Sequence, residues 1–281
     1  MMSRVYRLSF VAVIILCGAF IMFPRTESYQ QGAAMIALQD GYVEEIAEAA
    51  KEEVQPLVEF VKIINSCGPY FEGECVNVRS GPGTSYPAVS RLRNDVVLKV
   101  GERVERDGQV WVKIIFDEWI RYPERVKTDW YVLDTFTETI QDKGDLEITD
   151  RDNLASTTKE IIVYRGEQKL YAYDNGVLFM EASISTGHDL TPTPRGIFEV
   201  YKKTPSRYMQ GPIPGISDQY YDLAGVPWNL YFTAEGAVIH GAYWHDNFGR
   251  PYSHGCVNLS PKDAETLYGW ADLGTRVVVK D

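Results

Sequence analysis

The residues with the clearest chemical potential are the cysteine and histidines gathered in residues 238–260. Three of the four histidines fall there, together with Cys256. A free thiol has a pKa of about 8.5 and becomes a strong nucleophile only once a base removes its proton. His240 ends an apolar run that would hold its ring rigidly, and the Gly-, Asn- and Pro-containing loop after it can return the chain. This pattern predicts a Cys–His pair of the kind that carries out covalent acyl transfer.

Gly255, directly before Cys256, has a use in the same chemistry. A residue without a side chain lets a substrate carbonyl approach the backbone N–H groups, which would then form an oxyanion hole. Two other interpretations are open: Cys256 as a buried structural cysteine, and His240, His254 and Cys256 as zinc ligands. Zinc would lack a fourth ligand and would remove the base, so acyl transfer is the preferred interpretation.

The order of these residues resembles that of a known family. His240-Gly, followed by Ser253-His-Gly-Cys-Val-Asn258, is similar to the active-site signature of the L,D-transpeptidase catalytic (YkuD-type) family. Ser-Thr-Gly at 185–187 and Thr-Pro-Arg-Gly-Ile-Phe at 193–198 resemble earlier segments of the same family. The resemblance covers about residues 159–281.

The resemblance implies a reaction on peptidoglycan stem peptides. Cys256 would attack the carbonyl between the third and fourth residues of a tetrapeptide stem and expel D-Ala. His240 would be the base, oriented by the backbone carbonyl of Gly241. An amine on the third residue of a second stem would then resolve the thioester, which gives a 3→3 cross-link.

The remaining site residues are also implied by the resemblance. The backbone N–H groups of His254, Gly255 and Cys256 would line the oxyanion hole. The substrate pocket would be lined by Trp244, Asn258, Ser253 and Tyr221. Other family members often carry arginine at the position of Asn258, so the contacts there are expected to differ. His245 is expected in a loop, facing solvent.

Partners and alternative functions follow from the same comparison. The resemblance implies donor and acceptor stem peptides as partners, carbapenem-type compounds as inhibitors, and neither a metal nor an organic cofactor. An L,D-carboxypeptidase would use the same acyl-enzyme with water as the acceptor, and the sequence does not separate the two. A non-catalytic cell-wall-binding protein is a further alternative, which the intact Cys–His pair disfavours.

Short strands are the elements that must position this chemistry. Alternating apolar residues predict strands at 161–164, 169–173, 177–180, 197–201, 237–239 and 277–279. One helix is expected from Pro261, just after a Ser260 cap, to about Trp270. Residues 159–281 are therefore expected to form a β-rich, sandwich-like domain with one short helix.

A second, smaller β module is expected over residues 67–138. Val76-Asn-Val-Arg-Ser-Gly-Pro-Gly83, and later Asp129-Trp-Tyr-Val132, resemble segments of a bacterial SH3-like domain. Runs at 96–100 and 110–116 read as its strands. The resemblance implies wall tethering, with a spacer as the alternative. Residues 139–158 are polar without an apolar period and are expected to be a linker.

The N-terminal segments indicate export. Arg4 and Arg7 precede an uncharged run at 8–23, so residues 1–25 are expected to be a secretory signal peptide or a retained membrane anchor. Residues 26–66 are expected to form an acidic helical stalk, interrupted at Pro56. Both alternatives place the rest of the chain in the cell envelope, outside the cytoplasm.

Cysteine use and charge fit that compartment. Cys67 and Cys75 flank a Gly/Pro loop and would form either a disulfide or two separate thiols. The 281-residue chain has a net charge of −11, and no basic run interrupts its acidity. A nucleic-acid-binding role therefore has no electrostatic support.

Overall fold

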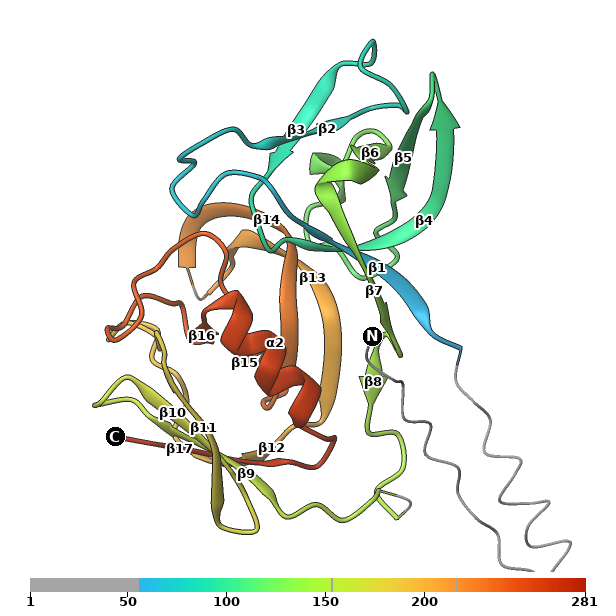
Figure 1. Cartoon of the computed structure of the whole chain (residues 1–281). Coiled ribbons are helices and arrows are strands. Elements are labelled where there is room, and N and C mark those ends of the chain that lie inside the picture. The colour runs from blue at the N-terminus through green and yellow to red at the C-terminus, as the bar shows by residue number, and fades with distance from the viewer. Residues whose placement is uncertain (1–55, 153, 216) are drawn as a thin grey trace, which may run out of the picture. The chain divides into compact units, whose positions relative to one another are not determined.

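The computed structural model describes residues 56–152, 154–215 and 217–281. This part of the chain has three β-sheets and one α-helix, which confirms the mainly β fold class (Figure 1). The expected signal or anchor segment at 1–25 and the stalk up to residue 55 lie outside the described residues. Among the described residues, no helix is long and apolar enough to cross a membrane.

The first sheet belongs to the SH3-like module and has seven strands in the order β3-β2-β6-β5-β4-β1-β7. In chain order these strands are β1 (Val58–Ile63), β2 (Val76–Arg79), β3 (Ala88–Leu92), β4 (Val97–Arg106), β5 (Gln109–Ile114), β6 (Trp130–Leu133) and β7 (Thr137–Asp142). Alternation explains their packing, since Val76 and Val78 of β2 are buried while Asn77 between them is exposed. A disulfide joins Cys67 to Cys75, the first of the two alternatives.

Two segments of this sheet differ from the expected organisation. Residues 58–63 are expected in the helical stalk but form β1, which is hydrogen-bonded to β4 on one side and to β7 on the other. Residues 137–142 form β7, so the expected linker at 139–158 begins inside a strand, and β8 (Leu146–Glu147) adds a short pairing with β13. Long-range pairing overrides local composition here, because the polar side chains of β7 tolerate the exposed edge of a sheet.

The remaining two sheets form the C-terminal domain. One has the order β11-β10-β9-β17-β12 and contains β9 (Lys159–Tyr164), β10 (Lys169–Asp174), β11 (Val177–Ser183), β12 (Gly196–Glu199) and β17 (Arg276–Lys280). The other has the order β16-β15-β14-β13-β8 and contains β13 (Lys202–Ile213), β14 (Ser217–Tyr231), β15 (Val238–Gly241) and β16 (Val257–Leu259). Buried side chains from both sheets share one hydrophobic core.

The helix α2 (Pro261–Trp270) has the bounds that the sequence predicts. The Ser260 hydroxyl accepts the N–H of Asp263 at 3.1 Å, which satisfies one of the unpaired N–H groups of the first turn. Its buried face packs on the strands that carry the chemistry, β14 to β16. The helix therefore covers one face of these strands (Figure 1).

The long β13–β14 hairpin is absent from the sequence prediction and connects the C-terminal domain to the SH3-like module. Tyr208 of β13 and Val226 of β14 are buried in the hydrophobic core of the module. The Ser206 hydroxyl donates to the carbonyl oxygen of Val97 at 2.6 Å. The two domains thus share a packed boundary along this hairpin.

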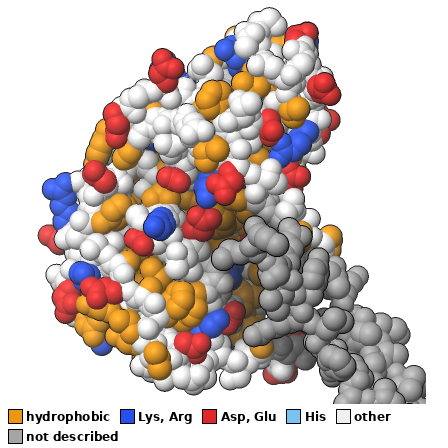
Figure 2. Space-filling model, viewed as in Figure 1, with side chains coloured by type: hydrophobic (Ala, Val, Ile, Leu, Met, Phe, Trp, Pro, Cys, Tyr) orange, Lys and Arg blue, Asp and Glu red, His pale blue; other side chains and the backbone are white. Residues whose placement is uncertain are grey.

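On the face shown in Figure 2, acidic and basic side chains are interspersed.

Candidate active site

The predicted base and nucleophile lie on, or directly before, two short parallel strands. His240 of β15 lies directly opposite Asn258 of β16. Cys256 comes immediately before β16, and its Sγ lies 4.0 Å from the carbonyl oxygen of Gly236, in the segment that leads into β15. Cys256 therefore lies two residues before the position of the strand pair that faces His240.

The surroundings of Cys256 favour a thiol that stays protonated until a base acts. Cys256 is half-buried and is the free cysteine of the described residues. Burial raises the pKa of this thiol above its usual value, although a hydrogen bond with the Val238 backbone and the charge of Arg207 act in the opposite direction. A protonated thiol needs an adjacent general base to react.

His240 has the properties of that base. Its side chain is 2 % exposed, and burial lowers the pKa of His240 to about 4, so the ring is neutral at pH 7. Nδ1 lies 3.1 Å from the carbonyl oxygen of Gly241, which can only accept a hydrogen bond. The proton of the neutral ring is therefore on Nδ1, and Nε2 carries the lone pair that can take a proton. Trp244 stacks on the ring at a centroid distance of 5.7 Å and holds its orientation.

A braced turn presents Cys256. The buried Ser253 hydroxyl donates to the carbonyl oxygen of Cys256 at 2.5 Å and accepts the N–H of Gly255 at 3.2 Å. The Ser253 carbonyl accepts the N–H of His188 at 3.0 Å, which ties the turn to the neighbouring loop. Gly255 has a φ of 122°, a region that favours glycine. Ser253, which is expected to bind substrate, stabilises this turn.

Of the three N–H groups expected to line the oxyanion hole, one is already hydrogen-bonded. The N–H of Gly255 is directed at Ser253, so Gly255 contributes its backbone conformation rather than a free donor. Among the described residues, no hydrogen-bond acceptor is paired with the N–H groups of His254 and Cys256. These two groups flank the thiol and are available to a developing negative charge on a substrate oxygen.

Aromatic side chains form the walls around this pair. Tyr221 of β14 stacks on His254 with a centroid distance of 6.2 Å and an interplanar angle of 15°. Burial raises the pKa of Tyr221 to about 12, with a further contribution from Cys256, so its hydroxyl remains a hydrogen-bond donor at neutral pH. Tyr221 therefore lies against His254, two residues before the thiol, and Trp244 lies against the His240 ring.

Asn258 and His245 have different environments from those expected. Asn258 is buried, and its side-chain amide lies 2.9 Å from Nε2 of His245, so it supports the site from behind rather than lining the pocket. His245 does not face solvent: it is 2 % exposed and packs against Tyr252 at a centroid distance of 4.6 Å. Burial lowers the pKa of His245 to about 4. A neutral ring is needed here because Nδ1 accepts the N–H of Asn247 at 3.1 Å.

Arg207 of β13 is a candidate functional residue that sequence reasoning missed. Burial raises the pKa of Cys256 and lowers that of His240; the positive charge of Arg207 opposes the first shift and adds to the second. The guanidinium is held by the Tyr231 hydroxyl, to which Nη1 donates at 2.6 Å. Glu118, from the SH3-like module, accepts the N–H of the next residue, Tyr208, at 2.8 Å, and burial raises the pKa of Glu118 to about 7. No motif surrounds Arg207, so only the hairpin geometry reveals it.

A zinc site is not assembled by these side chains. Within the described part of the chain, no three His, Cys, Asp or Glu residues are grouped closely enough to hold a metal ion. The ligand set considered from the sequence (His240, His254 and Cys256) is therefore not gathered around a common point. The arrangement fits a nucleophile, a base and two backbone donors.

Comparisons with known proteins match both domains of the chain. A family model of the L,D-transpeptidase catalytic domain matches residues 158–279, and a model of the bacterial SH3 domain matches residues 75–133. The chain is 34% identical over 102 residues to probable L,D-transpeptidase 3 of Mycobacterium tuberculosis (strain ATCC 25618 / H37Rv), covering 34% of this chain and 37% of the relative. It is 31% identical over 114 residues to L,D-transpeptidase 2 of Mycobacterium tuberculosis (strain CDC 1551 / Oshkosh), covering 37% of this chain and 27% of that relative.

These matches span a limited part of each relative. The chain covers less than two fifths of the length of either curated protein. Among solved structures, the catalytic domain of the E. faecium L,D-transpeptidase acylated by ertapenem has 27% identity and a TM-score of 0.39, covering 45% of this chain and 100% of that one. Residues 158–279 thus match the L,D-transpeptidase catalytic domain, and residues 75–133, which precede them, match the bacterial SH3 domain.

Proposed function

We propose that this protein is a peptidoglycan L,D-transpeptidase that forms 3→3 cross-links through an acyl-enzyme on Cys256. The observation that supports the proposal is the parallel pairing of β15 with β16: His240, a buried and neutral imidazole, lies opposite Asn258, two residues after the half-buried free thiol of Cys256. The family match supports the reaction class. We further propose that the protein works in the cell envelope, where peptidoglycan is found.

The first half of the reaction acylates the enzyme. Nε2 of His240 takes the Cys256 proton, and Sγ attacks the carbonyl between the third and fourth residues of a tetrapeptide stem. The N–H groups of His254 and Cys256 stabilise the oxyanion; removing one such donor typically costs about 10²–10³ in rate. The C–N bond breaks, the leaving amine of D-Ala takes the proton from His240, and a thioester remains on Cys256.

The second half transfers the acyl group. The side-chain amine of the third residue of a second stem attacks the thioester and gives its proton to His240. The C–S bond breaks, a new amide links the two stems, and the proton returns to Cys256. If water attacks instead, the same acyl-enzyme yields a tripeptide, which is the L,D-carboxypeptidase alternative.

Trapping the intermediate tests the mechanism. The purified protein is mixed with a disaccharide-tetrapeptide donor without acceptor, quenched in acid and examined by intact mass and peptide mapping. We expect an adduct of the donor minus D-Ala on Cys256, and a carbapenem should acylate the same residue. An adduct on another residue, or an unchanged mass with both reagents while the protein is folded, would refute the Cys256 mechanism.

A further inference from the structure

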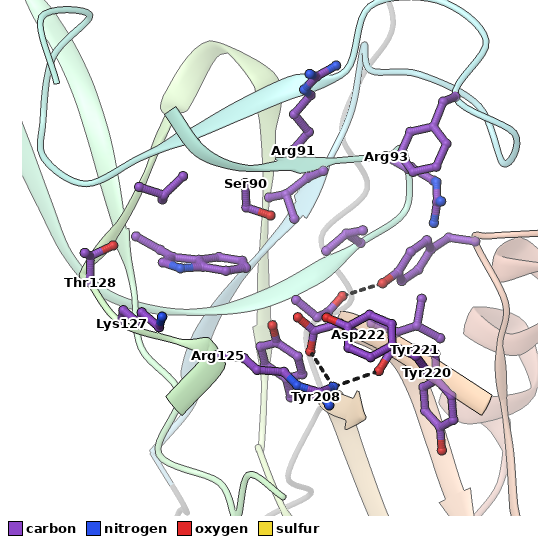
Figure 3. A pocket seen from close by; sticks show the side chains of 18 residues that line it. Ser90, Arg91, Arg93, Arg125, Lys127, Thr128, Tyr208, Tyr220, Tyr221 and Asp222 are labelled. Carbon is purple, nitrogen blue, oxygen red and sulfur yellow. Dashed lines mark hydrogen bonds and ion pairs between the residues drawn. The ribbon is translucent and has the colours of Figure 1, made fainter. Parts of the chain in front are cut away.

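A groove of about 600 Å³ lies between the SH3-like module and the β13–β14 hairpin. Strand β3 and the segment after it form one side, and residues 220–224 of β14 form the other (Figure 3). We call it the β3–β14 groove. Its volume falls in the range of about 300–1,000 Å³ that is usual for ligand sites. Aromatic side chains, including Trp130, Tyr208 and Tyr221, form much of its wall.

The groove is cationic, although the chain as a whole has a net charge of −11. Arg91, Arg93, Arg125 and Lys127 line it, against one acid, Asp222, among the described lining residues. Asp222 is already engaged: its carboxylate accepts from Gln210 at 2.9 Å and lies 3.9 Å from Arg125. Figure 3 shows Arg125 and Asp222 joined by a dashed line, with Arg93 and Lys127 at the two sides of the groove and the Arg91 side chain extending outward from its β3 rim. The charge balance therefore favours an anionic occupant.

Three of the cations have no carboxylate partner among the described residues. Arg91 and Lys127 are exposed and form no ion pair within that part of the chain. The guanidinium of Arg93 lies 3.7 Å from the centroid of the Phe71 ring, and its Nε is buried without a hydrogen-bond acceptor. A buried donor without an acceptor is costly, and a bound carboxylate could provide one. These side chains are thus available to an incoming anion.

Two pairs of aromatic contacts connect the groove to the candidate active site. Tyr221 lines the groove and stacks on His254, two residues before Cys256. Tyr243 also lines the groove and packs edge-on against Trp244 at 5.1 Å, and Trp244 stacks on the His240 ring. A ligand in the groove would therefore approach the thiol past Tyr221.

We propose that the β3–β14 groove binds the carboxylate-bearing end of the acceptor stem peptide. This inference rests on the proposed transpeptidase function, which requires a second stem whose amine reaches the thioester on Cys256. A stem peptide ends in a free carboxylate, which Arg91, Arg93 and Lys127 would pair, and its apolar atoms would pack on the aromatic wall. The SH3 module thus supplies part of the acceptor site.

The test separates the acceptor step from the donor step. Arg91→Glu and Lys127→Glu reverse exposed charges in the groove, and Lys262→Glu, an exposed lysine on α2 outside the groove, matches their change in net charge. The full chain is assayed for thioester formation without acceptor and for dimer formation against acceptor tripeptide concentration. We expect each groove variant to raise the acceptor KM about threefold to tenfold, since exposed ion pairs are modest and reversal replaces attraction by repulsion. Thioester formation should stay at the wild-type rate.

The possible results are distinguishable. Equal acceptor KM values in the groove variants and in Lys262→Glu would overturn the proposal, as would a loss confined to thioester formation. If the wild type forms no thioester, the proposed function fails, and calorimetric titration of the same proteins with acceptor tripeptide tests the groove independently. Binding that Arg91→Glu and Lys127→Glu weaken supports the groove site. Binding that they leave unchanged, or affinity for inorganic polyphosphate without affinity for the tripeptide, refutes it.

Discussion

The neutral state of buried His240 predicts a specific loss of stability in acid. The ring is 2 % exposed, and burial lowers the pKa of His240 from 6.5 to about 4. In the unfolded chain the ring takes up a proton near pH 6.5, whereas in the folded protein it resists protonation until about pH 4. A depressed folded-state pKa means that this stability is complete above pH 6.5 and is lost as the pH falls through this window.

The magnitude follows from the two pKa values. A pKa difference of one corresponds to about 1.4 kcal/mol, so a fall from 6.5 to about 4 corresponds to about 3.4 kcal/mol. About 3 kcal/mol of this is lost by pH 4. Glu118 acts in the opposite direction, because burial raises the pKa of Glu118 to about 7 and favours the folded state as the pH falls. A comparison between two proteins that both contain Glu118 cancels its contribution.

His240→Asn provides that comparison, since asparagine keeps a donor but does not titrate. The free energy of unfolding of both proteins is measured by urea titration from about pH 7.5 to about pH 4. We expect the wild type to lose about 3 kcal/mol more than His240→Asn over this range. His245→Asn should behave similarly, because burial lowers the pKa of His245 to about 4 as well. Parallel pH profiles for the wild type and His240→Asn would refute the assignment of a buried, neutral base.

Three further predictions concern the thiol, its turn and the disulfide. Arg207→Gln should raise the pKa of Cys256 and slow its alkylation near neutral pH by about threefold, with partial recovery in Arg207→Lys; identical alkylation profiles would exclude this electrostatic role. Gly255→Ala should lower stability by about 1–3 kcal/mol and slow thioester formation, because φ is 122°; an unchanged melting temperature would contradict this strain. The Cys67–Cys75 disulfide, at a sequence separation of 8, is tested in Cys256→Ala, which lacks the free thiol of the described residues. Reduction of this disulfide should lower the free energy of unfolding in urea by about 2.5 kcal/mol, and an unchanged free energy would contradict the pairing.

The chemistry was readable from the sequence because it is encoded locally. His240 and Cys256 lie 16 residues apart in one continuous stretch, so strand, loop and turn signals suffice to place them near each other. The helix after them was predicted with its bounds because Ser260 and Pro261 are strong start signals. The contact between His240 and Gly241 has the form that the family resemblance implies.

The supporting residues could not be read in the same way. Arg207 reaches the site from β13, more than thirty residues before His240, and nothing in its neighbours distinguishes it from a surface arginine. Asn258 sits in the signature, yet its side chain contacts the buried His245 within the domain. Such roles depend on which side of a strand faces the core, and irregular strand pairing such as that of β13 with β14 obscures the alternation.

The errors in the outer elements have a similar origin. Residues 58–63 follow an acidic, helix-favouring segment, but their β-branched and aromatic side chains pair with β4 and β7. Local composition carries no information on a partner strand that lies tens of residues away. The strand pairing therefore decides the structure. It overrides helix propensity, whose differences between ordinary residue types are below about 1 kcal/mol per residue.

The central claim is that Cys256 transfers a stem acyl group to a second stem. It is tested most directly by mass spectrometry of the products formed from disaccharide-tetrapeptide by the wild type and by Cys256→Ala. The account predicts dimers that have lost one D-Ala with the wild type and none with Cys256→Ala. Tripeptide monomers alone would identify a carboxypeptidase, and dimers that persist in Cys256→Ala would contradict the account.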